Sequence, residues 1–217
     1  MTQAPPDSLY LKEITISLKG KRLIAVKETI QPGQVLTVMG PSGSGKSSLL
    51  AYIGGFLAPV FKAHGKVFCG VTEITALPPQ KRKAGLLFQD PLLFPHMSVG
   101  RNLAFAAPST LSGRDARRAC ALQMLHALDL PEYIDADPDT LSGGQKARVA
   151  LGRVLMSEPS YLLLDEPFSK LDMALRDQMR ALVFNRARER QLPVVLVTHD
   201  QADADAAGGP VIHVDAN

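Results

Sequence analysis

The stretch Gly40-Pro41-Ser42-Gly43-Ser44-Gly45-Lys46-Ser47 decides the fold of this 217-residue chain. It fits the pattern GxxxxGK(S/T) of a phosphate-binding loop, whose glycines let backbone N–H groups approach an anion closely. Lys46 would bring a mobile positive charge to the β- and γ-phosphates of a nucleotide, and the Ser47 hydroxyl is short enough to bind Mg²⁺. With the next residue, Ser48, this stretch forms the predicted phosphate-binding set. An ordinary glycine-rich turn before a helix is the plain alternative.

The residues around this loop have the pattern of a strand before it and a helix after it. Residues 35–39 are a short apolar run, and residues 46–53 read as a helix that Gly54-Gly55 ends. Upstream, residues 9–18 and 23–30 alternate between apolar and polar side chains, as β-strands do. The loop therefore has the strand–loop–helix context that its chemistry requires.

Strands and helices alternate along the rest of the chain. The predicted strands cover residues 66–69, 84–88, 161–164 and 194–197, and the predicted helices cover residues 115–128, 145–156 and 173–190. The sequence predicts an α/β fold: a P-loop NTPase core with a mostly parallel sheet, an N-terminal antiparallel β subdomain and an inserted helical lobe. We expect one domain over residues 1–217, with the core and β subdomain at 9–90 and 141–217. Because no strand pattern occurs from residue 91 to 140, we expect the helical subdomain there.

Composition favours an ordinary globular protein. Apolar residues make up 46% of the chain and charged residues 21%, and no apolar run approaches the roughly 18 residues of a membrane-spanning helix. Residues 1–8 lack the features of a signal peptide, so we expect a frayed tail there. The two distant cysteines fit a reducing compartment, and the net charge of +3 is too mild to indicate a nucleic-acid partner.

Two adjacent carboxylates, Asp165 and Glu166, follow the apolar run at residues 161–164. Past the end of a strand the chain can turn, so the two neighbours can take different tasks. Asp165 would hold Mg²⁺, directly or through water, and Glu166 would be free to act as general base toward an attacking water. The plain alternative is a pair of solvated acids at a strand end.

The segment Leu141-Ser142-Gly143-Gly144-Gln145 has the pattern of a helix start. Ser142 is a good N-cap, the glycines permit close approach, and helix-forming residues follow. Such a helix end is a second anion site. One triphosphate does not need two such sites in one chain, which indicates that the sites meet across a dimer.

Together, the three motifs resemble the pattern of ATP-binding cassette (ABC) ATPases, and the LSGGQ segment resembles their signature. The resemblance covers nearly the whole chain. The chain is most similar to the short ATPase subunits of bacterial binding-protein-dependent importers of the thiamine, iron and sulfate group, particularly an uncharacterised thiamine-like branch. This resemblance implies hydrolysis of ATP with Mg²⁺ by a head-to-tail homodimer, with each ATP between Lys46 of one chain and Ser142 of the other. It also implies integral membrane permease subunits, indirectly a solute-binding protein, a location on the cytoplasmic face of the inner membrane, and no nucleic-acid partner.

The same resemblance implies roles for further residues. In the family pattern, Gln89 senses Mg²⁺ and the attacking water, Asp172 positions the partner subunit, and His199 contacts the γ-phosphate, although a lone histidine after a strand is usually structural. The implied catalytic residues are Lys46, Gln89, Glu166 and His199, and the implied metal ligands are Ser47, Gln89 and Asp165. The implied nucleotide-binding residues are Gly40, Pro41, Ser42, Gly43, Ser44, Gly45, Lys46, Ser47, Ser48, Ser142, Gly143, Gly144, Gln145 and Asp172.

The chain departs from the family pattern at Leu18, where members usually carry an aromatic residue that stacks on adenine. Since a base–aromatic stack is worth roughly 1–3 kcal/mol, we expect weaker ATP binding and poorer discrimination against GTP, and Leu18→Tyr should tighten ATP binding. If that substitution left the affinity unchanged, Tyr10 would become the candidate substitute. Lys170 replaces the small or neutral residue that is common in the family. Because the chain ends soon after His199, we expect no regulatory barrel of the kind that longer sugar-importer ATPases carry.

The apolar residues Leu92, Leu93, Phe94 and Met97 lie in the segment 91–102, where the family docks the coupling helices of its membrane subunits. Clustered apolar residues are more often core than interface, but the resemblance favours a groove with an apolar floor. Two other classes of function stay open. One is a soluble ABC ATPase acting on nucleic acid or ribosomes, and the other is a nucleotide-binding module that regulates without turnover.

Overall fold

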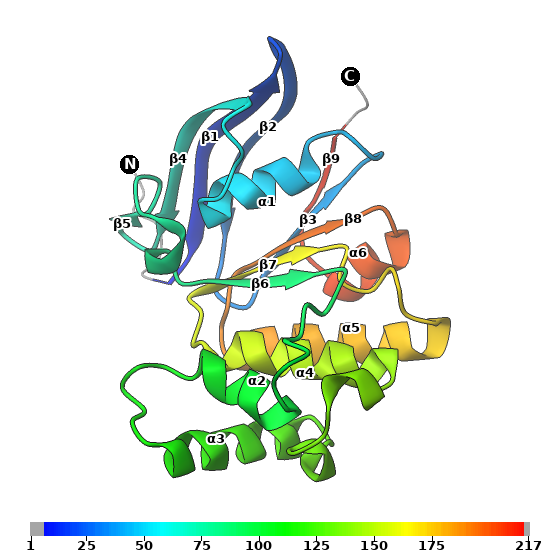
Figure 1. Cartoon of the computed structure of the whole chain (residues 1–217). Helices are drawn as coiled ribbons and strands as arrows, with labels where there is room; N and C mark the ends of the chain where they lie inside the picture. Colours follow the sequence, from blue (N-terminus) through cyan, green and yellow to red (C-terminus); the bar gives the residue numbers. More distant parts are fainter. Residues whose placement is uncertain (1–6, 215–217) are drawn as a thin grey trace. The chain divides into compact units, whose positions relative to one another are not determined.

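The chain folds into two compact units, each with its own hydrophobic core. The computed structural model describes residues 7–214 (Figure 1). Of these, residues 7–86, 160–166 and 184–214 form the first unit, and residues 87–159 and 167–183 form the second. The first unit contains nearly all strand residues of two β-sheets, and the second consists mainly of helices.

The first unit begins with a four-stranded antiparallel sheet in the order β2-β1-β4-β5. Its strands are β1 (Leu9–Leu18), β2 (Lys21–Ile30), β4 (Phe61–Cys69) and β5 (Thr72–Glu73). The strand predicted at residues 9–18 is confirmed. β2 and β4 are longer than predicted because Lys21 and Phe61 both pair with Leu18 and so extend the ladder to its end. Side-chain alternation alone did not indicate this extra pairing.

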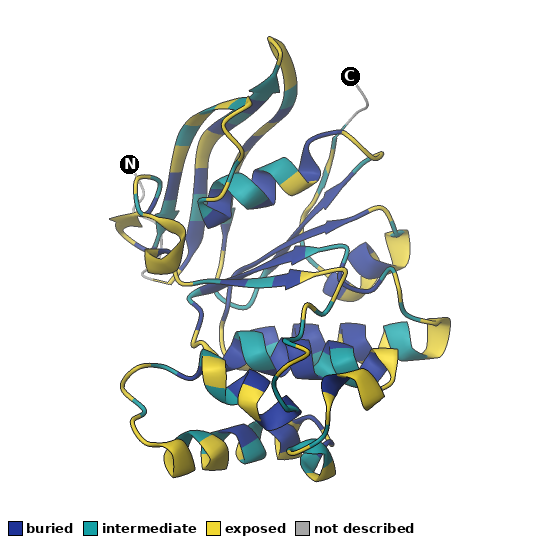
Figure 2. Ribbon diagram, viewed as in Figure 1, coloured by how far each residue is buried: buried dark blue, intermediate teal, exposed yellow. Residues whose placement is uncertain are grey.

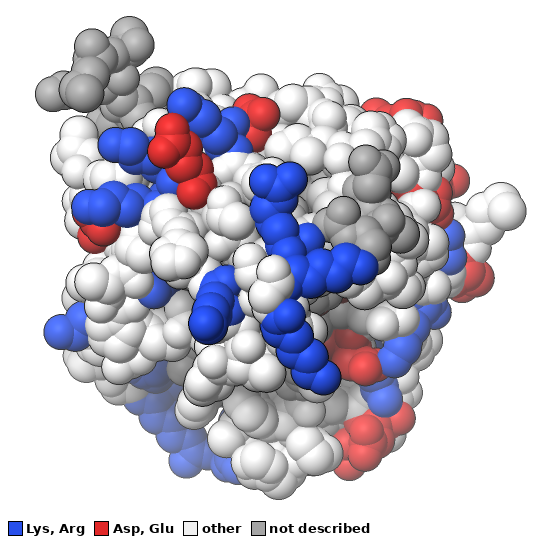
Figure 3. Space-filling model, turned by 90° about the horizontal axis from the view of Figure 1, so that it is seen from above, with Lys and Arg blue, Asp and Glu red and all other residues white. Residues whose placement is uncertain are grey.

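Charged residues lie on the exposed surface of this sheet. The view in Figure 3 shows Lys and Arg side chains gathered on one face, with acidic side chains beside some of them. Lys27 pairs with Glu13 at 3.2 Å, and Lys66 pairs with Glu73 at 2.7 Å. Exposed pairs of this kind stabilise a protein by about 0–1 kcal/mol each. They fit the solvated face of a sheet.

A five-stranded sheet in the order β6-β7-β8-β3-β9 forms the centre of the α/β fold. Its strands are β3 (Val35–Met39), β6 (Ala84–Phe88), β7 (Tyr161–Asp165), β8 (Val194–Thr198) and β9 (Val211–His213). β3 runs parallel to β8 and β9, and β7 runs parallel to β8. Every residue of β3 and β8 is buried (Figure 2), which explains why both appear in the sequence as nearly unbroken apolar runs. The predicted α/β fold with a mostly parallel sheet is confirmed.

Two helices of the first unit pack against this sheet. α1 (Lys46–Gly54) lies against β7 and β8, and Gly55, in a left-handed conformation with φ of 86°, ends it. The helix and its glycine stop are therefore as predicted. α6 (Gln201–Ala207) and β9 were not predicted, because elements of seven and three residues are too short for hydrophobic periodicity.

The second unit contains α2 (Val99–Ala106), α3 (Arg114–Ala127), α4 (Gly143–Met156) and the first part of α5 (Met173–Glu189). Val99, Leu103, Leu125 and Val149 are fully buried in its core. Residues 91–140, all of which the structure describes, contain helices and 3-10 turns and no strand, as the sequence pattern predicted. Over residues 7–214, no helix is both long and apolar enough to cross a membrane.

Ser8 corrects the prediction of a frayed N-terminal tail. Its side chain is fully buried, and its carbonyl accepts a hydrogen bond of 2.7 Å from the Gly70 N–H. The prediction is wrong at this residue because the sheet already holds the chain one residue before β1 begins. The rest of that predicted tail, apart from Asp7, lies outside the described residues.

Candidate nucleotide-binding site

The phosphate-loop motif forms the turn between β3 and α1 in the first unit. Gly45 caps α1 in a left-handed conformation with φ of 91°. A Cβ atom at this position would lie 2.9 Å from the Cβ of Leu23 in β2. Glycine is therefore needed both for the backbone angle and for the close approach of β2. The turn brings the backbone N–H groups of a helix start to the end of a buried strand, a suitable place for an anion.

Two side chains inside the loop are buried and polar. The Lys46 ammonium donates hydrogen bonds to the carbonyls of Gly40 at 2.7 Å and Pro41 at 2.8 Å. The Ser44 hydroxyl is buried and has no hydrogen-bond partner among the residues that the structure describes. A buried hydroxyl without a partner costs about 1–3 kcal/mol. Within residues 7–214, the Lys46 ammonium bonds only to carbonyls of its own loop, and the Ser44 hydroxyl has a donor without an acceptor. Both groups are suited to binding anionic oxygens.

Ser47 and Asp165 form a hydrogen bond although they lie far apart in the sequence. The Ser47 hydroxyl, in the first turn of α1, donates a hydrogen bond of 3.0 Å to the Asp165 carboxylate at the end of β7. Burial raises the pKa of Asp165 above its usual range, the Ser47 hydrogen bond opposes that rise, and the nearby Glu166 carboxylate adds to it. A hydroxyl and a partly buried carboxylate side by side form an oxygen pair of the kind that Mg²⁺ prefers.

Glu166 and His199 meet at the ends of the adjacent strands β7 and β8. Glu166 adopts a left-handed backbone conformation with φ of 46°, and its N–H donates to the Val197 carbonyl at 2.9 Å. Non-glycine residues rarely adopt this conformation. It makes the backbone turn sharply immediately after Asp165. The His199 Nδ1 atom lies 3.2 Å from a Glu166 carboxylate oxygen. The two neighbouring acids thus have different partners, Ser47 for one and His199 for the other.

A buried hydrogen bond supports the segment that carries His199, and the sequence analysis missed it. The Thr198 hydroxyl donates to the Asp203 carboxylate at 2.5 Å, and both side chains are buried. The Asp200 N–H donates to the same hydroxyl at 3.1 Å, and the Asp200 carboxylate caps α6. The N-cap pattern at Asp200 was the available signal for α6. The bonds fix the chain on both sides of His199.

The remaining predicted residues lie in the second unit. Gln89 follows β6 and is exposed, and the Asp172 carboxylate accepts a hydrogen bond of 3.0 Å from the Leu175 N–H. Ser142 caps α4 as predicted and forms a capping box with Gln145. The structure thus brings Lys46, Ser47, Asp165, Glu166 and His199 together in the first unit.

The two glycines at the start of α4 have different surroundings. A Cβ atom on Gly144 would lie 2.4 Å from a methyl carbon of Leu175, whereas a Cβ atom on Gly143 would meet nothing within 4 Å. Ser142 and Gly143 are both exposed. The outer part of this helix start is therefore open to a ligand that approaches from outside the chain.

Tyr10 is badly placed to replace an adenine-stacking residue at Leu18. Tyr10 stacks on Phe68 with ring centroids 6.0 Å apart, and it lies at the opposite end of β1 from Leu18. Eight residues of extended strand separate the two positions by roughly 26 Å. Leu18 itself is half-buried beside Phe61.

Fold and site together define a P-loop nucleotide-binding protein, since a strand, a glycine loop with Lys46 and a helix carrying Ser47 stand beside the acidic end of β7. The sequence profile of the family "ABC transporter" matches residues 23–169. The chain therefore belongs to the ATP-binding subunits of ABC transporters, and it is an ABC-type ATPase.

Several curated relatives are similar over most of the chain. The "Uncharacterized ABC transporter ATP-binding protein YnjD" of Escherichia coli K12 is 47% identical over 199 residues, which cover 91% of each chain. The "Thiamine import ATP-binding protein ThiQ" of Chelativorans sp. BNC1 is 36% identical over 94% of this chain and 82% of its own. ThiQ of Salmonella typhimurium LT2 is 41% identical over 81% of this chain and 73% of its own. The resemblance to short importer ATPases is confirmed.

Proposed function

We propose that this chain powers a solute importer, as a head-to-tail homodimer attached to separate membrane permease subunits at the cytoplasmic face of the membrane. A solute-binding protein would deliver the solute to those permeases. The proposal rests on two contacts at the ends of the neighbouring strands β7 and β8. Ser47 donates a hydrogen bond to Asp165, and His199 lies within hydrogen-bond distance of Glu166. The two ThiQ relatives, whose names describe thiamine import, support import over export.

ATP and Mg²⁺ fit the residues of the first unit. The loop from Gly40 to Ser48 would hold the phosphates with its backbone N–H groups, and the unsatisfied Ser44 hydroxyl would gain a partner. Ser47 and Asp165 would hold Mg²⁺, with Gln89 as a further ligand. When bound, Mg²⁺ would supply positive charge that neutralises the β- and γ-phosphate oxygens.

The protein's own side chains would carry out the remaining steps. Lys46 would exchange the carbonyls of Gly40 and Pro41 for phosphate oxygens as the nucleotide enters. Glu166 would accept a proton from the attacking water, and His199, within hydrogen-bond distance of Glu166, would hold that carboxylate in place and contact the γ-phosphate. The separation of metal binding and proton transfer onto Asp165 and Glu166 follows from the sharp turn between them.

The second anion site supports a dimer. Ser142 and Gly143 are exposed at the start of α4, where helix N–H groups can meet an anion from outside the chain. In a head-to-tail pair, this helix start with Gly144 and Gln145 would face the phosphates that Lys46 of the other chain holds. Asp172 would position the partner. Closing the dimer would complete two sites together.

An apolar cluster in the second unit would receive the permease. The Phe94 ring lies 5.1 Å from that of Phe105 and 5.1 Å from the Arg153 guanidinium. Arg153 also donates to the carbonyl of Leu92 at 2.8 Å. Leu92 and Phe105 are exposed, at 58% and 62%. Exposed apolar side chains on a fixed segment are typical of a docking surface.

The decisive experiment is copurification of the tagged chain with membrane proteins, followed by ATPase assays in proteoliposomes. We expect a permease to copurify and a transported solute to stimulate ATP hydrolysis. Stimulation by nucleic acid or ribosomes, without any membrane partner, would instead favour a soluble ABC ATPase. Absence of ATP turnover under every condition would favour a regulatory module.

A further inference from the structure

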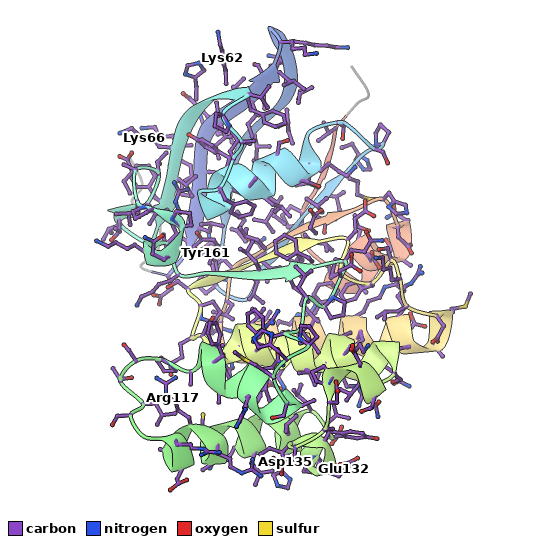
Figure 4. The ribbon with its side chains drawn as sticks, viewed as in Figure 1. Lys62, Lys66, Arg117, Glu132, Asp135 and Tyr161 are labelled. Atoms are coloured by element: carbon purple, nitrogen blue, oxygen red, sulfur yellow. The ribbon has the colours of Figure 1, made fainter. Side chains whose placement is uncertain are left out.

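A hollow of about 510 Å³ lies within the second unit, apart from the residues proposed to bind ATP. Its lining includes Arg101 on α2, Arg114, Arg117 and Arg118 on α3, and Asp135 after the 3-10 turn at Pro131–Tyr133. Figure 4 labels Arg117 and Asp135 among these helices. The volume is within the range of small-molecule sites, roughly 300–1,000 Å³.

The charge of the lining is strongly unbalanced. Four guanidinium groups and one carboxylate line the hollow. Guanidinium groups are never deprotonated at physiological pH, so this excess of positive charge is permanent. Crowded cations repel one another, and a bound anion would relieve that repulsion.

Two of the four arginines are held in place by neighbouring groups. Arg117 donates to the carbonyls of Ala104 at 3.1 Å and Ala107 at 3.3 Å. Arg118 makes two hydrogen bonds of 2.7 Å to Asp135, and this pairing holds the pKa of that carboxyl below its usual range. Fixed guanidinium groups lose less conformational entropy when a ligand binds.

The other two arginines have donors to spare. The side chains of Arg101 and Arg114 are exposed, and neither makes a hydrogen bond or ion pair with another residue in the described range 7–214. The Arg101 charge acts on the Asp135 carboxylate without a direct ion pair, and both exposed guanidinium groups can still donate to a ligand in the hollow.

We propose that this hollow binds a small anion carrying two or more phosphate groups. Phosphate is favoured over carboxylate because its several acceptor oxygens point in different directions and can meet guanidinium groups from α2 and α3 together. Arg101 and Arg114 contact the ligand directly, Arg117 adds fixed positive charge, and Asp135 opposes binding. This site does not depend on the proposed function, because it uses none of the residues assigned to ATP.

Calorimetric titration of the full-length chain with inorganic pyrophosphate tests the proposal. The double variant Arg101→Ala/Arg114→Ala is expected to weaken binding by at least about tenfold, since each charged hydrogen bond contributes that much or more. Asp135→Asn should have the opposite effect. It removes the one negative charge of the lining, so pyrophosphate binding should become several-fold tighter. Arg190→Ala removes an exposed arginine elsewhere and is the matched control.

The variant Lys46→Ala distinguishes binding in this hollow from binding at the phosphate loop. In Lys46→Ala, pyrophosphate binding should persist, and hydrogen exchange should slow at residues 98–104 and 114–118 when the ligand is added. Loss of binding in Lys46→Ala, retention of binding in the triple variant Lys46→Ala/Arg101→Ala/Arg114→Ala, or no binding at millimolar pyrophosphate would each overturn the proposal. Binding of an acidic peptide but not of pyrophosphate would also overturn it, in favour of a protein partner. Thermal denaturation of each variant confirms that it is folded.

Discussion

At the scale of single residues, the site is determined by pairings that span long sequence distances. The sequence motifs predicted Lys46, Ser47, Asp165 and Glu166 as candidates, since each follows or precedes a recognisable apolar run. The 3.2 Å approach of His199 to Glu166 could not be predicted from spacing, because it requires β7 and β8 to be neighbours in the sheet.

Glu166→Gln keeps the size of the side chain but removes its basicity. We expect ATP turnover to fall by about 10²–10⁴-fold, because a glutamine cannot accept a proton from water. Phosphate release measures the loss, and gel filtration should detect an ATP-bound dimer that no longer dissociates. Glu132→Gln, an exposed glutamate of the second unit, is the control. Undiminished turnover would refute the assignment of the general base.

Asp165→Asn should separate stability from activity. Because burial raises the pKa of Asp165, its proton is bound more tightly in the folded than in the unfolded chain, and stability falls as the pH rises from the unfolded pKa through the folded one. The ionised carboxylate is thus a cost at neutral pH. Asparagine can still accept the Ser47 hydrogen bond, so we expect the free energy of unfolding to rise by about 1 kcal/mol at pH 7.

Chemical denaturation at two pH values measures this effect. The advantage of the Asp165→Asn variant should disappear at a pH below the pKa of the unfolded aspartate, where the carboxyl is protonated in both the folded and the unfolded chain, while ATP hydrolysis should be low at both values. An equal or larger stabilisation at acidic pH would show that charge burial is not its cause.

At the scale of elements, long periodic or apolar segments were predicted well and short ones were not. β3 and β8 follow from nearly unbroken apolar runs, because buried parallel strands have no polar face. α2 was missed because the helix has only eight residues, although Ser98 caps it. Ser8 was misread because a polar residue near a terminus gives no sign that a sheet will bury it.

The start of α4 offers a matched pair of glycine substitutions. Gly143→Ala meets no neighbouring atom and gains helix propensity, so stability should be unchanged or raised by up to about 1 kcal/mol. Its ATPase activity should nevertheless fall, because the added methyl group faces the space proposed for the partner's nucleotide. Gly144→Ala should destabilise the protein by about 1–3 kcal/mol, because its methyl group would collide with Leu175.

Thermal denaturation and ATPase assays at several protein concentrations distinguish the two effects. A Gly143→Ala variant that hydrolyses ATP at the native rate would argue against a phosphate contact at this helix start. A Gly144→Ala variant as stable as the native chain would show that Leu175 can move aside.

At the scale of the whole molecule, the proposed attachment to a permease depends on the apolar cluster of the second unit. Phe94 is the centre of that cluster and is half-buried, so substituting it risks unfolding. Leu92 and Phe105 are more exposed, and their replacement removes apolar surface without opening the core. The double variant Leu92→Asp/Phe105→Asp should therefore weaken copurification of membrane subunits by about tenfold or more, since it buries two charges in an apolar interface.

The same double variant should hydrolyse ATP at the native rate when it is isolated, because neither side chain belongs to the phosphate loop or the carboxylate pair. Stimulation by solute in proteoliposomes should be lost in parallel with copurification. Val71→Asp, an exposed apolar residue of the first unit, is the matched control and should retain both. If the double variant still assembled with the permease and responded to solute, another surface would have to carry the attachment.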